Sequence, residues 1–377
     1  MIEQGRESGE GLSFWLVGFG LLILLPLLNV LPGTDSWLHV SDFSLNLLGK
    51  FLAFAILAIG LDLIWGYTGI LSLGHGVFFG LGAYAIGMHM MLSIGTESVY
   101  GSALPDFMVW NQVKELPLFW SPFHSSWFAL AAAVLVPTLF AALFGFLAFR
   151  SRIKGVYFSI ITQALALSAW LVFNRNETNL GGTNGLTDFK TLLGFRLSEP
   201  GTQRGLYVVT VLCLGGAYLL CRWIIRSRTG RVLVAIRDSE QRVLFSGYSP
   251  ANYKLFVFVV SAALAGLAGA LYVPQVGIVT PAQIGVLPSI EMVIWVAVGG
   301  RGTLAGAVVG AVGVNLGRSV LTNHFPELWP FFLGGLFIAV VLFFPEGCVG
   351  LARKLGGWRW SGKAGAENPA KPAERQG

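Results

Sequence analysis

Ten long apolar runs constrain this chain more than any other feature. They lie at residues 12–32, 43–65, 69–92, 127–149, 155–173, 206–225, 254–274, 285–300, 303–321 and 328–345. Only 12% of the residues are charged, whereas soluble domains carry about 25%. A run of about 20 apolar residues spans a bilayer as a helix, because a helix satisfies its own backbone groups in hydrocarbon. The sequence therefore predicts an all-α, polytopic integral membrane protein with one transmembrane domain over residues 12–346.

Basic residues predict how these runs are oriented. Arginine and lysine concentrate in the loop at 150–154, in the loop at 222–254 and after Leu351. With ten spans all three segments fall on one side, which the positive-inside rule identifies as the cytoplasm. Residues 1–11 and 347–377 are then cytoplasmic ends, and the Gly-, Ala- and Pro-rich second end is predicted to be disordered. The net charge of +6 indicates topology and contact with membrane lipid, with no nucleic-acid partner.

The cytoplasmic loop at 226–253 carries the signals of a short helix. Asp238 is the predicted N-cap, Gln241 would complete a capping box, and Gly247 is a natural stop. Ser249 and Pro250 then begin the next span. A capped polar helix between two membrane spans has no lipid-facing purpose, so we predict that a cytosolic partner binds it. The residues expected to take part are Asp238, Ser239, Glu240, Gln241, Arg242 and Gly247.

Glycine is the second strong signal, with 49 residues. Gly302, Gly306 and Gly310 recur at four-residue spacing, which lets helix backbones approach closely in a membrane. Seven glycines between residues 66 and 87 lower helix propensity, and Gly74 and Gly76 flank a histidine there. We therefore predict an interrupted span, which at membrane depth must be buried in protein or line a cavity.

Five polar side chains inside the predicted spans are candidates for lining a transport path: Asp62, His75, Thr162, Gln163 and Glu291. A charged side chain in hydrocarbon costs about 2.5–3.5 kcal/mol, so Asp62 and Glu291 must face protein, water or a partner. Hydrogen bonding within the bundle is the alternative role for Asp62, and packing is the alternative for His75. Thr162 and Gln163 could present a donor and an acceptor to a neutral polar solute. The three cysteines lack the spacing of metal ligands, and no metal site is predicted.

Three long stretches resemble the permease subunits of branched-chain amino acid ABC importers. They are GLDLIWGYTGILSLGHGVFFGLGAYA (60–85), GRVLVAIRDSEQRVLFSGYSPANYKLFVFVVSAALAGLAGALY (230–272) and SIEMVIWVAVGGRGTLAGAVVGA (289–311). The resemblance covers roughly residues 43–346. ITQALALSAWLVFNRNETNLGGTNGLTDF (161–189) and DSEQRVLFSGYSP further resemble the urea branch, namely the second and larger permease of the urea ABC importer.

The resemblance implies a set of partners. A homologous second permease would complete the path across the bacterial inner membrane, and a periplasmic binding protein would deliver the solute. Two cytoplasmic ATPase subunits would bind ATP and Mg²⁺ and grip residues 239–246 as the coupling helix. The chain contains no G-x-x-x-x-G-K-[ST] motif, which agrees with ATP binding on separate subunits and with a transport subunit that is not itself an enzyme.

The resemblance favours urea as the solute, with branched-chain or other amino acids and short amides as the alternative. Urea is uncharged, and a conduit for it needs amides, hydroxyls and carbonyls rather than a fixed charge pair, which suits spans with few central charges. An ion-coupled carrier is an alternative of another class, and it would need an ionisable relay such as Asp62, His75 and Glu291. A membrane-embedded enzyme is disfavoured, because the chain lacks paired catalytic carboxylates, H-E-x-x-H and a nucleophile elbow.

Overall fold

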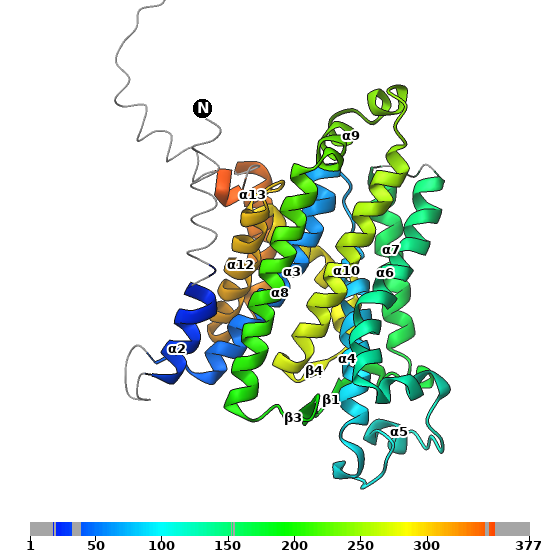
Figure 1. Ribbon diagram of the computed structural model, residues 1–377, viewed down its shortest axis with the longest axis vertical. Coiled ribbons are helices and arrows are strands. Elements are labelled where there is room, and N and C mark those ends of the chain that lie inside the picture. The colour runs from blue at the N-terminus through cyan, green and yellow to red at the C-terminus, as the bar shows by residue number, and fades with distance from the viewer. Residues whose placement is uncertain are drawn as a thin grey trace, which may run out of the picture.

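The protein folds as a bundle of membrane-length helices (Figure 1). The computed structural model describes residues 18, 20–31, 39–151, 153, 155–343 and 347–350. Seven helices in these ranges are long and apolar enough to cross a membrane. They are α3 (Asp42–Thr68), α4 (His75–Leu92), α6 (Ser126–Arg150), α7 (Val156–Phe173), α8 (Pro200–Arg226), α10 (Pro250–Val276) and α12 (Leu304–His324).

Three shorter apolar helical segments take the places of the other predicted runs. They are η1 and α2 (Gly20–Leu24, Leu25–Val30), α11 (Val286–Gly299), and η7 with α13 (Pro326–Leu328, Trp329–Phe343). The all-α membrane class is confirmed, while a count of ten full spans is not. Residues 347–350 are helical. The predicted ends at 1–11 and 351–377, the start of the first run, and residues 152 and 154 of the basic loop lie outside the described residues.

The two ends of the bundle differ in structure. One end carries α9 (Arg228–Phe245), which joins α8 to α10, and we refer to it as the α9 end (Figure 1). The opposite end, the β1–β4 end, carries two small antiparallel ladders, β1 (Leu186–Thr187) with β4 (Ile278–Val279) and β2 (Thr191–Leu192) with β3 (Phe195–Arg196). Short helical elements complete that end: η2 (Gly95–Glu97), α5 (Asp106–Trp110), η3 (Leu118–His124), η4 (Asn176–Thr178), η5 (Gly182–Asn184) and η6 (Pro281–Ile284).

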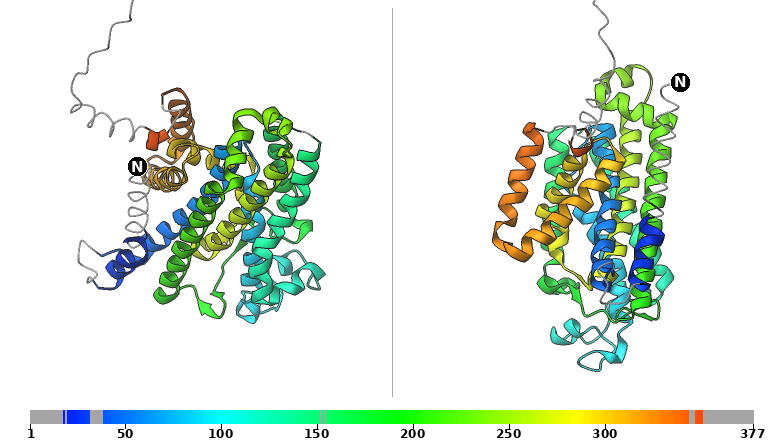
Figure 2. Two further views of the ribbon diagram at one scale, coloured as in Figure 1. Left: turned by 45° about the horizontal axis from the view of Figure 1, so that its top comes forward. Right: turned by 90° about the vertical axis from the view of Figure 1, so that its left-hand side faces the viewer.

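Helices α3 and α4 form the centre of the bundle. Most of their residues are buried, and α10 packs against both of them and against α6. Helices α6, α7 and α8 lie at the periphery and expose large apolar side chains such as Leu139, Leu171 and Leu212, as expected of surfaces in contact with lipid tails. Figure 2 shows α13 at another margin of the bundle.

The predicted interruption falls at the start of the third predicted span and not within it. Gly76, Gly80, Gly82 and Gly87 lie in the continuous helix α4. Helix α3 ends at Thr68, residues 69–74 are not helical, and α4 begins at His75 rather than near residue 69. His75 bonds to Ser261, which lies eleven residues into α10 from Pro250. At 1.5 Å per residue this is about 16 Å below the α9 end of α10. Helix α4 therefore starts deep inside the bundle.

Candidate functional site

The predicted cytosolic helix is the second half of a longer, bent element. Ser227 caps α9 by accepting a hydrogen bond from the Gly230 N–H at 3.4 Å. The helix then breaks at Ser239, whose φ of −161° and ψ of 94° are extended. Asp238 is thus the last residue of the first half and not an N-cap, and its carboxylate accepts a hydrogen bond from Arg237 Nε at 3.2 Å. The prediction of a capping box between Asp238 and Gln241 is wrong. The first half of α9 is helical through Asp238, so the non-helical residue is Ser239, one position after the predicted N-cap.

The predicted end of this helix is confirmed. Gly247 has a φ of +83°, which glycine adopts without strain. Its N–H donates to Leu244 O at 3.1 Å, and the Tyr248 N–H donates to Val243 O at 3.3 Å. This pair of bonds is a Schellman motif, which satisfies the last carbonyls of the helix. The next helix, α10, begins at Pro250 directly after.

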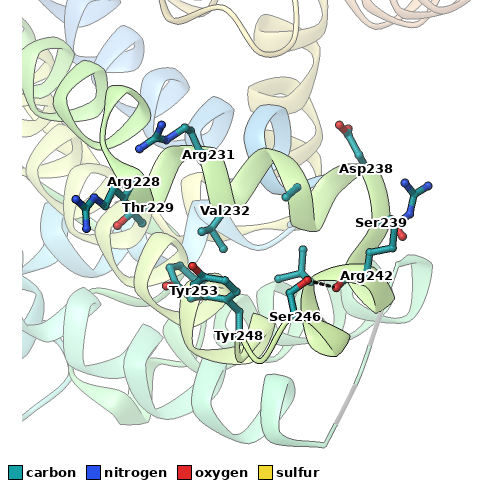
Figure 3. Close-up of a pocket in the computed structure, with 12 residues that line it drawn as sticks. Arg228, Thr229, Arg231, Val232, Asp238, Ser239, Arg242, Ser246, Tyr248 and Tyr253 are labelled. Carbon is teal, nitrogen blue, oxygen red and sulfur yellow. Dashed lines mark hydrogen bonds between the residues drawn. The ribbon is translucent and has the colours of Figure 1, made fainter.

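The bend of α9 shapes a groove at its end of the bundle. The two halves of α9 and the start of α10 enclose a cavity of about 690 Å³. Val232, Ala235 and Val243 give it apolar walls, and Figure 3 shows Tyr248 and Tyr253 between Arg228 and Arg242, which stand at opposite ends. The remaining lining residues are Thr229, Arg231, Asp238, Ser239 and Ser246. An apolar floor with a mainly basic rim suits a partner that inserts an apolar side chain flanked by acidic groups.

Glu240 holds the second half of α9 against the bundle. Its Oε1 lies 2.8 Å from Lys254 Nζ, and the two side chains are only 26% and 7% exposed. The expectation that Glu240 projects toward a partner is therefore wrong, because its carboxylate forms an ion pair with Lys254 of the same chain. Gln241 lines a smaller cavity of about 380 Å³ on this side, whereas Arg242 is exposed at the groove.

The α9 end of α3 is fastened to two other parts of the chain. Arg237 Nη1 donates to Gly66 O at 3.0 Å, and Arg301 Nε donates to Trp65 O at 3.2 Å. Both carbonyls belong to the last turn of α3, where backbone donors run out. Trp65 O also accepts the Gly69 N–H at 3.1 Å, so Arg301 is its second donor. Asp62, which is fully buried, accepts the Gly302 N–H at 2.7 Å. We call this group of contacts the α3 clasp, and through it α9 directly contacts the helix that precedes the interruption.

His75 occupies the interior of the chain rather than a surface. Ser261 Oγ donates to Gly60 O at 2.6 Å, so its oxygen accepts the Nε2–H of His75 at 2.7 Å. Nδ1 then accepts from Ser72 Oγ at 3.0 Å. With no exposed area and both ring nitrogens bonded, His75 joins α3, the interruption, α4 and α10. This is the geometry of a packing histidine, the alternative role given to His75 above, and the ring lies on no surface of the chain.

The neighbouring helix α7 supports the interruption as well. Thr162 Oγ1 accepts the Leu73 N–H at 3.0 Å and donates within its own helix, while Ser159 donates to Leu71 O at 2.8 Å. Gln163, one position further on, is half-buried and makes no hydrogen bond among the described residues. Of the two polar residues predicted here, Thr162 has its hydroxyl hydrogen-bonded to backbone groups, whereas the side-chain amide of Gln163 has no hydrogen-bond partner among the described residues.

Glu291 lies away from the clasp, toward the β1–β4 end. Its Oε2 accepts from Arg318 Nη1 of α12 at 2.6 Å, and the carboxylate is nearly buried. No hydrogen bond links Asp62, His75 and Glu291 to one another in the described structure. The described residues also hold no group of three potential metal ligands.

The comparison with known proteins decides the family. Residues 43–341 match the family described as branched-chain amino acid transport system, permease component. The chain belongs to this permease family. No solved structure matches it.

Individual relatives of this permease are distant in sequence. The high-affinity branched-chain amino acid transport permease LivM of Escherichia coli K12 is 25% identical over 377 residues, covering 93% of this chain and 81% of that protein. LivM of Salmonella typhimurium is 26% identical over 336 residues, covering 83% and 72%. BraD of Pseudomonas aeruginosa is 27% identical over 313 residues, covering 79% and 91%.

The predicted glycines divide into packing and turn positions. A Cβ on Gly74 would lie 2.6 Å from Thr162 O, and one on Gly76 would lie 2.8 Å from Ser289 Oγ. A Cβ on Gly310 would overlap the Trp295 carbonyl oxygen. Gly302 is different, because it lies in the turn before α12 with a φ of +79° and belongs to no helix ridge. The close approach of α11 and α12 therefore depends on Gly306 and Gly310.

Gly306→Leu is expected to lower the yield of folded permease strongly. A Cβ there would lie 2.6 Å from the Gly299 carbonyl oxygen, so a leucine must force α11 and α12 apart. Gly216→Leu on α8 is the control, because no described residue lies within 4 Å of its added Cβ. Size-exclusion profiles of the two purified variants measure the difference. Equal monodisperse yields would show that the predicted packing is unimportant.

Several residues of the site were not predicted from the sequence. Arg237 and Arg301 resemble any other cytoplasmic arginine in a positive-inside count, and Ser261 is a lone hydroxyl in an apolar run. Lys254 and Arg318 are isolated cations near the ends of predicted spans. A cation inside or at the edge of an apolar run is a signal for a buried partner, and it would have identified Lys254 and Arg318.

Proposed function

We propose that this chain is one of two permeases of an ATP-driven importer in the bacterial inner membrane. A homologous second permease would form the other half of the path, and a periplasmic binding protein would deliver solute at the β1–β4 end. Two cytoplasmic ATPase subunits would bind ATP and Mg²⁺, one of them seated on α9. Both termini and the α9 end would then be cytoplasmic.

The groove of α9 is the observation that carries this proposal. It combines apolar walls with Arg228 and Arg242 at its ends, and it lies on the element whose Arg237 reaches the end of α3. A partner that moves α9 would therefore move the last turn of α3 and the interruption behind it. The coupling residues of this groove include Ser239, Arg242 and, as the helix stop, Gly247. Asp238 stands at the rim, whereas Glu240 and Gln241 face the bundle side.

We infer urea as the solute from the sequence stretch at 161–189. This stretch folds into the second part of α7, η4, η5 and β1, and β1 pairs with β4 at the β1–β4 end of the bundle. The available amide of Gln163 lies on it. A sequence that distinguishes the urea branch would thus line the entrance, where a small polar solute arrives.

A branched-chain or other amino acid is the second candidate solute. The relatives that match over most of the chain are named for branched-chain amino acid transport. The expectation that the spans hold no fixed charge pair is also wrong, since Glu291 and Arg318 form one between α11 and α12. A zwitterionic solute needs such opposite charges more than urea does.

Uptake by the reconstituted complex tests the function and the solute together. The permease, its partner permease, both ATPases and the binding protein are placed in liposomes, and ATP-dependent entry of labelled urea and labelled leucine is measured. Urea entry without leucine entry supports the proposal, and the reverse establishes the second candidate. If neither solute enters while ATP is hydrolysed, both candidates are wrong.

Arg242→Glu is expected to abolish solute-dependent ATP hydrolysis and uptake. The substitution reverses the charge at one end of the groove, and like charges across an interface cost several kcal/mol. Arg196→Glu, an exposed arginine at the β1–β4 end, is the matched control. Co-purification of the ATPase with each variant measures docking directly. Full docking of the Arg242 variant would place the ATPase elsewhere.

A further inference from the structure

Three charged side chains gather in the half of the bundle nearer the β1–β4 end, between α3, α11 and α12. Glu291 and Arg318 form the ion pair described above, with 10% and 46% of their side chains exposed. Lys50 of α3 lies within electrostatic range of Arg318. Two cations and one carboxylate leave the group, which we call the outer cation cluster, with one positive charge in excess.

Aromatic rings hold the outer cation cluster in place. Lys50 Nζ lies 5.9 Å from the centroid of the Phe54 ring, which lies 4.8 Å from that of Trp295. Trp295 follows Glu291 by one helical turn on α11. On the other side, the Arg318 guanidinium lies 5.6 Å from the Trp329 ring. The aromatic contacts therefore restrict the positions of the Lys50 and Arg318 side chains.

The exposure of Arg318 indicates that protein or water, and not lipid tails, covers this side of α12. Its side chain is half exposed on a membrane-length helix, and arginine in hydrocarbon costs about 2.5–3.5 kcal/mol. An arginine that merely reached for the headgroups would point away from the protein, whereas this one turns toward the nearly buried Glu291. No described residue lies within 4 Å of a Cβ added at Gly313 or Gly317 on α12, so a second helix can approach closely beside α12.

Two amide oxygens nearby have no partner among the described residues. Asn46 Oδ1 lies one turn from Lys50 on α3 and is buried without a hydrogen bond there, and so is Gln275 Oε1. Gln275 is adjacent, since a Cβ on Gly49 would overlap its amide oxygen. A buried acceptor without a partner is rare, and each of these oxygens can accept a hydrogen bond from a solute N–H.

We propose that the outer cation cluster lines the solute path where the second permease packs against α12, and that Lys50 and Arg318 receive the carbonyl or carboxylate oxygen of the solute. The amide oxygens of Asn46 and Gln275 would accept its N–H groups. Urea and an amino acid both carry such an oxygen beside N–H donors, so the chemistry serves either. The proposal rests on the proposed function, because it requires a path shared by two permeases.

Charge-selective modification of Arg318→Cys in the assembled importer tests the proposal. Cys213, Cys221 and Cys348 are first replaced by alanine. The unmodified variant is expected to lose about tenfold in uptake, the size of a lost charged hydrogen bond. An aminoethyl thiosulfonate reagent, which restores a positive charge, should recover uptake, whereas the negative sulfonatoethyl reagent should not. Solute-loaded binding protein with ATP should slow both reactions.

Two further variants keep the test decisive. Leu139→Cys on α6, a site 65% exposed toward lipid, should stay inert to both reagents. Lys50→Met should lower uptake as well, whereas Lys114→Met in an exposed loop should not. If Arg318→Cys does not assemble, Lys50→Met alone decides the matter.

The outcomes separate this inference from the proposed function. A wild-type importer that carries neither urea nor leucine refutes the function. A wild-type importer that carries one of them, with unchanged uptake in Arg318→Cys and Lys50→Met or with Arg318→Cys as inert as Leu139→Cys, refutes only the outer cation cluster. The solute carried by the wild type identifies whether the oxygen is a carbonyl or a carboxylate.

Discussion

Replacement of Arg237 by methionine is expected to leave ATP hydrolysis intact and to lower solute uptake about tenfold or more. Arg237 is the link by which α9 holds the last turn of α3, through its bond to Gly66 O at 3.0 Å. Methionine keeps the length of the stem and removes the donor. The groove is left in place because Arg237 is not among its lining residues, so the ATPase should still dock and turn over.

The ratio of ATP hydrolysed to solute imported measures this uncoupling in liposomes. Arg150→Met is the matched control, since Arg150 is an exposed arginine at the same end of the bundle, on α6, and does not line the groove. Arg301→Met should act in the same direction as Arg237→Met, because it removes the bond to Trp65 O. Normal coupling in a variant that carries both Arg237→Met and Arg301→Met would show that the α3 clasp does not transmit motion from α9.

The sequence predicts the bundle well because hydrocarbon imposes a simple rule on it. Apolar runs locate every described membrane-length helix. The glycine-rich stretch predicts an interrupted span, but only residues 69–74 are non-helical, and α4 is continuous from His75 onward. Hydropathy does not decide whether the three shorter apolar segments cross the membrane. Helix α11, with 14 residues, is too short to be assigned as a full crossing from hydropathy alone.

Capping signals were less reliable than hydropathy in the α9 region. Asp238 and Gln241 fit a capping box, but Ser227 begins the helix eleven residues earlier and carries it through Asp238. The pattern is local, whereas the position of the break depends on the packing of both halves. Glu240 shows the same limit, because only the fold brings Lys254 within 2.8 Å of it.

The candidate path residues could not be separated by sequence for a related reason. A polar residue in a span is compatible with a wet path or with a satisfied internal bond, and both avoid lipid. The structure gives Asp62, His75 and Thr162 internal partners, and among the described residues it gives none to Gln163. The partners are a backbone N–H, two serines and a loop amide, none of which carries a recognisable motif.

His75→Ala is expected to destabilise the permease by about 3 kcal/mol or more, because it removes two buried hydrogen bonds and leaves a cavity. The ring bridges Ser72 and Ser261 at 3.0 and 2.7 Å, and edge contacts with Phe78 and Phe258 surround it. Its loss frees the first turn of α4 at the depth where the span is interrupted. Denaturant unfolding of the purified permease in detergent measures the change.

A double-mutant cycle separates the bridge from the loss of volume. Ser261→Ala removes the Nε2 partner and also frees Gly60 O, which Ser261 Oγ holds at 2.6 Å. If His75 acts through this serine, the double variant should be clearly less destabilised than the sum of the two single variants, since they share one interaction. His124→Ala, at an exposed histidine in η3, should leave stability unchanged. Strictly additive losses for His75 and Ser261 would show that the histidine only fills space. Other contacts, such as the bond from the Gly76 N–H to Ser289 Oγ at 3.1 Å, would then position the start of α4.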